Sequence, residues 1–306
     1  MTSQYPASNH KAFLMRDGVT PSCVHLPAQS NFITLLDFLI AKFPHIQASE
    51  WQQRFHDGLV MSENGNVLSV DSPYLTNQKV YYYRHLTQEI VVPFSHQIIF
   101  ENQDLLVVDK PHFLPVTPTG QYVQQTLLTR LKKQFNLPDL TPIHRLDKDT
   151  AGLILFSKTV SSRALYQQLF AQKQVQKIYY AIAPYRENIL FPQHLKLHLE
   201  RGEPFYTMQI HPDKIANSET QIELIARQGE WGKYQLKPIT GKMHQLRVHM
   251  NYLGLPLKND ELYPQICHRA DVDFSSPLQL LAKSIQFVDP ITGQDFYFES
   301  EKELLF

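Results

Sequence analysis

The first part of the chain carries apolar residues at helical spacing. Over 31–43 they recur three and four residues apart, which predicts a helix that ends before a proline. Residues 49–56 predict a second helix, which begins at a serine suited to cap it. An Asn-Gly pair at 64–65 and an apolar run at 80–83 then predict a hairpin region. We therefore expect a small N-terminal domain over residues 1–95.

The rest of the chain is patterned mainly as strands. Short apolar stretches bounded by turn residues predict strands at Gln97–Phe100, Leu105–Asp109, Gly152–Ser157, Lys177–Ile182, Thr220–Ala226, Lys233–Lys237, Ser284–Val288 and Asp295–Phe298. Helical spacing predicts helices at Val123–Phe135, Ser161–Gln172, Gly241–Leu253 and, as a short one, near Leu278. Strands outnumber helices and do not alternate strictly with them. We therefore expect a second domain over 96–306 with an α+β fold, in which a mostly antiparallel mixed sheet is flanked by helices.

The composition excludes several classes of protein. The 306 residues are 43% hydrophobic and 19% charged, which provides apolar material for a substantial core. The two cysteines, Cys23 and Cys267, cannot build a disulfide framework or a four-thiolate zinc site, which indicates a reducing compartment. The first residues lack the features of a secretory signal, and the longest apolar stretch, 32–40, is too short to span a membrane. We expect a cytoplasmic protein, monomeric because no long apolar stripe indicates a partner, and without a membrane partner.

Charge is balanced overall but unevenly distributed. The chain holds 29 Lys and Arg against 29 Asp and Glu, which argues against a protein that coats nucleic acid without discrimination. Locally, 126–177 has nine Lys and Arg against three acids, and 233–258 has five against none, whereas 259–306 has three against nine. Such excesses arise by chance on solvated surfaces, but two basic stretches also suit a surface for a polyanion.

The segment from His144 to Phe156 places ionisable side chains in a loop before a strongly apolar strand. An aspartate in a polar loop usually forms a turn or caps a helix. Asp147 differs because His144, Arg145 and Lys148 flank it, and nearby cations keep a carboxylate ionised. An ionised carboxylate beside an apolar wall can act as a nucleophile or a general base.

The segment 236–249 predicts a turn followed by a helix. His244 and Arg247 lie three residues apart and share one stripe of that helix. His244 and His249 are five residues apart rather than four, so they are unsuited to share a metal ion on one helix face, and we expect no metal site. A plain amphipathic helix with a solvated basic face would explain the same pattern without any function.

Five motifs occur in an order and spacing that point to one family. They are Asp109-Lys110-Pro111 with Leu114-Pro115-Val116, His144–Leu153, Lys177–Ala181, Leu236–His249, and Leu253–Leu257 with Asp260. Together they resemble the signatures of the RluA-type pseudouridine synthases, over residues 97–299. The resemblance implies a central catalytic cleft, RNA as the substrate, and isomerisation of uridine to pseudouridine. This reaction exchanges one glycosidic bond for another without redox change, so the resemblance implies neither a cofactor nor a metal.

The resemblance also implies roles for particular residues. Asp147 matches the catalytic aspartate, which attacks the sugar C1′ or the uracil ring or assists glycal formation, and the sequence does not choose among these routes. Arg247 would pair with Asp147 and keep it ionised, and Tyr179 would lie against the uracil face. Because the base must leave its stack, Arg145 would fill the vacated position or grip the RNA backbone. The other residues expected to contact RNA are His144, Lys148, Lys110, Lys242, His244 and Gln245.

Three positions depart from the family pattern. Ala151 replaces the usual serine, Asn259 stands where glycine is usual, with a changed turn as the expected result, and Leu281 occupies a position where histidine is common. None of them changes the carboxylate, so we expect an active enzyme. The N-terminal region faintly resembles an S4-type RNA-binding domain, but six Lys and Arg against seven acids up to Gln97 predict weak affinity for RNA.

Two other functions account for parts of the same pattern. Asp147 and Asp149 would lie roughly 6.5 Å apart on an extended chain, within the range of the carboxylate pairs of glycoside hydrolases. A non-catalytic RNA-binding or ribosome-assembly protein could also retain the cleft without turnover. The sequence does not determine whether the target is ribosomal RNA, transfer RNA or both.

Overall fold

The protein is described by a computed structural model, which covers residues 15–84, 88–267 and 269–306. The expectation about a secretory signal concerns the first residues, which lie outside this described part. The chain divides into two compact units. The first holds the residues up to Glu89 with Pro118–Gln124 and Thr129–Asp139, and the second holds Ile90–Thr117, Gln125–Leu128 and Leu140–Phe306. The first unit therefore takes in two middle segments that a single boundary at residue 95 would assign to the second.

The described part of the first unit contains a small antiparallel sheet, two helices before residue 60 and most of a third helix, α4 (Leu127–Phe135). β1 (Ser22–His25), α2 (Leu35–Lys42), α3 (Ala48–His56), β2 (Val60–Ser62) and β3 (Lys79–Tyr82) follow one another along the chain, and the sheet order is β1-β3-β2. Trp51 of α3 has no exposed surface and packs in the core of this unit. α2 begins at Leu35 rather than at residue 31 because Thr34 caps it, its hydroxyl accepting the N–H of Asp37 at 3.1 Å. The S4-type resemblance of this region stays a prediction.

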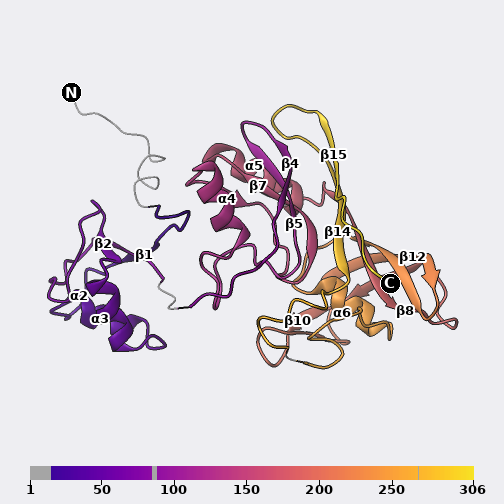
Figure 1. The fold of residues 1–306 in the computed structure, drawn as a ribbon, viewed down its shortest axis with the longest axis horizontal. Coiled ribbons are helices and arrows are strands. Elements are labelled where there is room, and N and C mark those ends of the chain that lie inside the picture. The colour runs from indigo at the N-terminus through magenta and orange to yellow at the C-terminus, as the bar shows by residue number, and fades with distance from the viewer. Residues whose placement is uncertain (1–14, 85–87, 268) are drawn as a thin grey trace. The chain divides into compact units, whose positions relative to one another are not determined.

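The second unit is built on a large mixed sheet. Its strands are β4 (Gln97–Glu101), β5 (Leu105–Lys110), β6 (Thr141–Pro142), β7 (Ala151–Ser157), β8 (Gln176–Pro184), β9 (Gln193–Leu197), β12 (Ser218–Gln228), β13 (Trp231–Pro238), β14 (Leu280–Val288) and β15 (Asp295–Glu299). The order is β4-β5-β7-β14-β8-β13-β12-β9, with β6 beside β7 and β15 beside β14 (Figure 1). Only the pair β7–β14 is parallel among the described strands of this sheet. The predicted α+β fold with a mostly antiparallel sheet is confirmed.

All the predicted strands are present, but several short ones were not foreseen. β6, β9 and the separate pair β10 (Leu199–Arg201) and β11 (Met208–Ile210) have too few apolar residues for a clear pattern. The short helix predicted near Leu278 is wrong. There the N–H of Gln279 donates to the carbonyl of Lys258 at 3.0 Å, and its own carbonyl accepts the N–H of Ile182 at 3.1 Å. These bonds hold the chain extended as it enters β14.

Three helices of the described residues follow β5 along the chain. α4 (Leu127–Phe135) begins later than predicted, because the N–H groups of Val123 and Gln124 donate instead to the carboxylate of Glu89, at 2.7 and 2.9 Å. α5 (Val160–Ala171) packs in a cluster with β5 and β7, and α6 (Gln245–Tyr252) packs in a cluster with β8, β12 and β13. Burying one large apolar side chain contributes about 1.5–3 kcal/mol. The loop before β7 and the turn before α6 are therefore each attached to an element that is held by buried apolar side chains. No helix in the described residues is long and apolar enough to cross a membrane.

One row across the sheet aligns the segments that carry the predicted motifs. Gly152 of β7 lies opposite Ala282 of β14, which in turn lies opposite Tyr179 of β8. Tyr179 then pairs with Leu236 of β13. Gly152 has a φ of 109°, and a Cβ there would lie 2.3 Å from the carbonyl oxygen of Ala282, so only glycine permits this approach. The row brings the loop before β7 and the turn after β13 to the same part of the sheet, near β8.

Candidate active site

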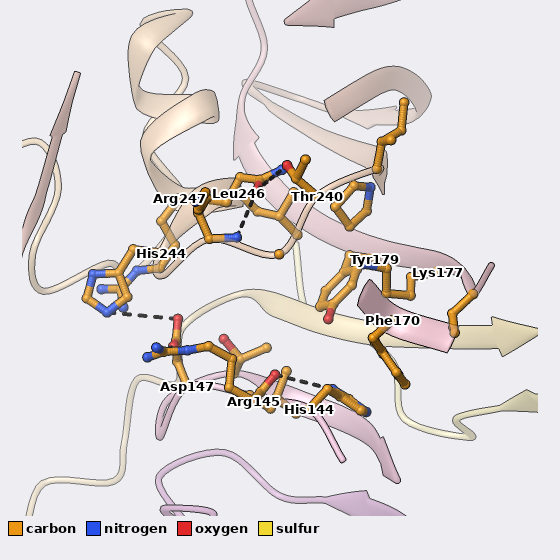
Figure 2. Close-up of a pocket in the computed structure, with 18 of the residues that line it drawn as sticks. His144, Arg145, Asp147, Phe170, Lys177, Tyr179, Thr240, His244, Leu246 and Arg247 are labelled. Carbon is orange, nitrogen blue, oxygen red and sulfur yellow. Dashed lines mark hydrogen bonds and ion pairs between the residues drawn. The ribbon is translucent and has the colours of Figure 1, made fainter. Parts of the chain in front are cut away.

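A cavity of about 450 Å³ opens in the second unit where these segments meet (Figure 2). Its walls are the loop before β7, the end of α5 with the residues that follow it, β8, and the turn between β13 and α6. The basic side chains that line it are Arg145, Lys173, Lys177, Lys242 and Arg247. Within the described part of the chain, the lining contains a single carboxylate, that of Asp147. The cavity is therefore strongly cationic around one anionic group.

Asp147 is reachable from the cavity, because its side chain remains 18% exposed. Among the described residues, two groups face its carboxylate within 4 Å. Nη2 of Arg145 lies 3.7 Å from Oδ1, and Nε2 of His244 lies 3.9 Å from Oδ2 (Figure 2). Both distances are too long for a hydrogen bond, so the carboxylate lies near these two groups without being hydrogen-bonded to either. It is thus available to a substrate.

The expected pair between Arg247 and Asp147 is wrong. Arg247 instead donates from Nε and Nη2 to the two carboxylate oxygens of Asp260, at 2.8 and 2.6 Å. The two side chains are 2% and 0% exposed. Burial lowers the pKa of Arg247, but the hydrogen bonds and charge of Asp260 outweigh it and raise that pKa above its ordinary value. Arg247 lines the cavity as a fixed positive charge that acts on Asp147 without touching it.

Tyr179 lines the same cavity from β8. Figure 2 shows its ring between the turn at Thr240 and the loop that carries Asp147. Burial, with a contribution from the negative charge of Asp147, raises the pKa of Tyr179 above its ordinary value. The phenol therefore stays protonated at neutral pH, and its ring offers an apolar face to whatever enters.

His144 both lines the cavity and holds the loop. Its Nε2 accepts the N–H of Leu155 at 3.2 Å, so Nδ1 carries the proton and faces the carbonyl of Arg145 at 3.3 Å. Its ring stacks on Phe170 with centroids 4.7 Å apart. Burial lowers the pKa of His144 to about 4, so the ring is neutral at pH 7. Its expected contact with RNA stays a prediction.

Lys110 was expected to contact RNA, and the structure contradicts this. Lys110 has no exposed surface, and its ammonium donates to the carbonyls of Pro111, Leu114 and Lys148, each at 2.9 Å. Burial lowers the pKa of Lys110 to about 7. Through its bond to the carbonyl of Lys148, Lys110 holds the loop after Asp147 against the end of β5.

Gln245 is likewise structural rather than a contact for RNA. Its Oε1 accepts the hydroxyl of Thr240 at 2.7 Å and the N–H of Lys242 at 3.0 Å. Its Nε2 donates to the carbonyl of Glu219 and the hydroxyl of Thr220, both at 2.9 Å. These four bonds use the hydrogen-bonding capacity of the amide and fix the turn before α6.

The remaining predicted residues differ in their access to the cavity. Arg145 and Lys242 are exposed at the lining, where phosphate groups could reach them. Lys148 lies outside the lining, with its ammonium 3.7 Å from the carboxylate of Asp149. Asp149 also lies outside the lining. The carboxylate pair that a hydrolase would need with Asp147 is therefore not assembled.

Lys177 is a residue of the site that was given no role from the sequence. Lys177 lines the cavity two residues before Tyr179, and burial lowers the pKa of Lys177 to about 8. Alternate residues of a strand share a face, so this spacing was the available signal. Asn259, where glycine was usual, has a φ of 65° and donates from Nδ2 to the carbonyl of Pro277 at 3.0 Å. Asparagine tolerates this conformation, so the turn keeps a left-handed residue.

No group of three or more His, Cys, Asp or Glu side chains in the described residues is arranged to hold a metal ion. The expectation that the reaction needs neither metal nor cofactor stays a prediction.

Comparison with known proteins identifies the family. The family model described as RNA pseudouridylate synthase matches residues 104–252. An uncharacterised RNA pseudouridine synthase of Synechocystis sp. is 30% identical over 236 residues, which cover 75% of this chain and 79% of that protein. This chain belongs to the RNA pseudouridylate synthase family. The resemblance drawn from the five motifs is thereby confirmed, and the protein is an RNA-modifying isomerase.

Two further relatives extend the comparison. The ribosomal large subunit pseudouridine synthase D of Borreliella burgdorferi is 31% identical over 179 residues, which are 55% of each of the two chains. The solved structure of human RNA pseudouridylate synthase domain containing 1 shares 22% identity and aligns with a TM-score of 0.56, covering 70% of this chain and 86% of that one. The latter likeness shows that the fold is shared.

Proposed function

We propose that this pseudouridine synthase uses Asp147 as its catalytic residue on a uridine that has left its RNA stack. The observation that carries the proposal is the isolation of Asp147: in the part of the chain described, it supplies the sole carboxylate of a cavity lined by five Lys and Arg. Such a cavity attracts the phosphates of RNA and leaves one ionisable oxygen pair to meet the reacting nucleotide.

The chemistry requires little beyond that carboxylate and an orienting face. The N1–C1′ bond breaks, the base rotates, a C5–C1′ bond forms, and C5 loses a proton while N1 gains one. Asp147 attacks C1′ or the uracil ring, or assists glycal formation, and each route uses the same exposed oxygens. Tyr179, protonated and lining the cavity, supports the uracil ring during the rotation.

The RNA contributes a single extruded nucleotide to the cavity. Pockets of about 300–1,000 Å³ suit small ligands, and this cavity falls within that range. Removing a base from its stack costs a few kcal/mol. Arg145, with its side chain 60% exposed beside Asp147, is placed to fill the vacated position or grip the backbone. Lys242 and His144 would add contacts at the cavity.

Structured ribosomal or transfer RNA is the substrate class that we propose. The Borreliella relative is named for the large ribosomal subunit, which supports ribosomal RNA as the first class to test. The free and exposed Cys23 and Cys267 support a reducing, cytoplasmic location. We propose that the protein acts there as a monomer.

Replacing Asp147 with asparagine tests the assignment. Asp147→Asn keeps the shape of the side chain and removes its charge, so product formation should be abolished while RNA affinity stays largely unchanged. Release of tritium from RNA labelled at uridine C5 measures the product, and a filter-binding assay measures the affinity. Retained turnover in Asp147→Asn would overturn the assignment.

Asp149→Asn is the matched control. Its carboxylate lies outside the cavity, so the same substitution there should leave tritium release close to that of the parent protein. Loss of activity in both variants, with free uracil among the products, would indicate a hydrolytic carboxylate pair instead. RNA binding without any tritium release by the parent protein would support the non-catalytic alternative.

A further inference from the structure

His244 lies closer to Asp147 than a surface residue for RNA would need to. Its side chain is 10% exposed, and its Nε2 is 3.9 Å from Oδ2 of Asp147. It occupies the residue before α6 with a φ of 50°, a left-handed conformation that is uncommon for residues other than glycine. Conformations of this kind persist where the surrounding structure requires them and cluster at functional sites. Here the conformation directs the imidazole toward the catalytic carboxylate (Figure 2).

Tyr263 determines which nitrogen of His244 carries the proton. The hydroxyl oxygen of Tyr263 accepts the N–H of Met208 at 2.8 Å and lies 3.0 Å from Nδ1 of His244. If Nδ1 also donated to that oxygen, the phenolic proton would have no acceptor among the described residues. The consistent arrangement is that the hydroxyl donates to Nδ1, so that Nε2 carries the proton. The Nε2–H then faces Asp147.

Tyr263 is itself held in place by the buried ion pair of the site. Its backbone N–H donates to Oδ1 of Asp260 at 3.2 Å, and its side chain is 8% exposed. The guanidinium of Arg247 lies 5.4 Å from the centre of its ring. Arg247 and Asp260 therefore act on Asp147 indirectly, by fixing the tyrosine that orients His244.

The charged groups around His244 leave it neutral. Burial lowers its pKa below the ordinary value, Arg247 and Arg145 lower it further, and the carboxylates of Asp147 and Asp260 act in the opposite direction. A neutral N–H orients a carboxylate without neutralising it. A permanent cation at the same place would bind the carboxylate tightly, as Arg247 binds Asp260.

We propose that Tyr263 and His244 are positioning residues for Asp147, in which the Tyr263 hydroxyl fixes His244 as the Nε2–H tautomer and that N–H orients the Asp147 carboxylate. This inference rests on the proposed catalytic role of Asp147. It replaces the expectation that His244 serves mainly as an RNA contact. The loop that carries Tyr263 then contributes to turnover, although it is distant from Asp147 in the sequence.

The tautomer of His244 can be observed in the unmodified protein. Long-range ¹H–¹⁵N NMR of protein labelled at histidine distinguishes Nε2–H from Nδ1–H, and His244→Asn, which lacks the imidazole, assigns the signal. We expect the Nε2–H pattern at pH 7. An Nδ1–H pattern, or a protonated ring at that pH, would overturn the proposal whatever the variants below show.

Tyr263→Phe then removes only the hydroxyl. We expect the His244 signal to move away from the pure Nε2–H pattern, and single-turnover tritium release to slow roughly tenfold, the rate equivalent of about one hydrogen bond. RNA affinity should not change. Tyr252→Phe is the matched control, because Tyr252 is 56% exposed and lies outside the cavity lining, and it should alter neither the signal nor the rate. A Tyr263→Phe protein with an unchanged rate or an unchanged tautomer would overturn the proposal.

His244→Asn tests the second member of the pair. Asparagine tolerates the left-handed backbone, so the fold should be retained, and turnover should fall with RNA affinity unchanged. A fall in affinity with an unchanged single-turnover rate would instead make His244 an RNA contact and overturn the positioning role. Failure of the proposed function is distinguishable, because Asp147→Asn would then retain activity.

Discussion

Asp260 is the residue on which the geometry of Arg247 depends. Its carboxylate accepts two hydrogen bonds from the guanidinium and two from the backbone N–H groups of Leu262 and Tyr263. Bidentate pairs of this kind fix direction as well as distance. Both side chains are buried, so the pair is itself shielded from water.

The single substitution Asp260→Asn should destabilise the protein severely. The substitution leaves the guanidinium of Arg247 buried without a counter-charge, and breaking one side of a buried pair costs about 3–5 kcal/mol. We expect the free energy of unfolding, measured by urea titration, to fall by about that amount. Glu223→Gln is the control, because Glu223 pairs with Lys237 on the surface, where both side chains are well exposed. Equal effects of the two substitutions would contradict this account.

At the scale of elements, the contact between β7 and β14 positions the catalytic loop. These strands form the parallel pair of the sheet, and their register places Gly152 against Ala282. Asp147 lies only five residues before Gly152 in the sequence. A displacement of β7 would therefore move the carboxylate relative to Tyr179 on β8.

Gly152→Ala should disrupt this contact. The new Cβ would lie 2.3 Å from a backbone oxygen that cannot move freely, and a positive φ adds about 1–3 kcal/mol of strain. We expect the free energy of unfolding to fall by more than about 3 kcal/mol, and tritium release to be lost. Gly229→Ala is the control. Gly229 has a φ of 60°, and a Cβ added there would meet no atom of the described residues within 4 Å, so only backbone strain should remain. Similar losses at the two glycines would show that the close approach is unimportant.

At the scale of the whole molecule, buried histidines couple stability to pH. Burial lowers the pKa values of His112, His144 and His249 to about 4. His249 has no exposed surface, and its Nδ1 has no hydrogen-bond partner within the described residues. Protonating these rings in the folded state would bury uncompensated charge.

The protein should therefore lose stability as the pH falls from 6.5 to 4. In this window the unfolded chain binds protons at these histidines and the folded chain does not, so the free energy of unfolding decreases with falling pH. For His249 the slope is about 1.4 kcal/mol per pH unit. Urea unfolding at a series of pH values measures it, and His249→Gln should flatten the dependence. His56→Gln, at an exposed side chain, should not, and a pH-independent stability in the parent protein would contradict the expectation.

The sequence by itself determined most of the elements and the catalytic candidate. Strands and helices follow from the spacing of apolar residues that are neighbours in the chain. The major ones were predicted, but α2, α4 and α6 each begin four residues later than that spacing indicated. Asp147 was recognisable because its flanking cations and the apolar strand that follows are also local. The family was recognisable from five such local patterns.

Only the tertiary structure decided which polar groups meet. Arg247 pairs with Asp260 rather than Asp147. The ammonium of Lys110 donates to backbone carbonyls, and Tyr263 orients His244. The partners in these bonds come from loops whose approach depends on sheet register and packing. A sequence shows which side chains can donate or accept hydrogen bonds. Where each side chain points is set by the packing of apolar residues that are distant in the sequence. That orientation decides whether a polar residue binds substrate or supports the fold.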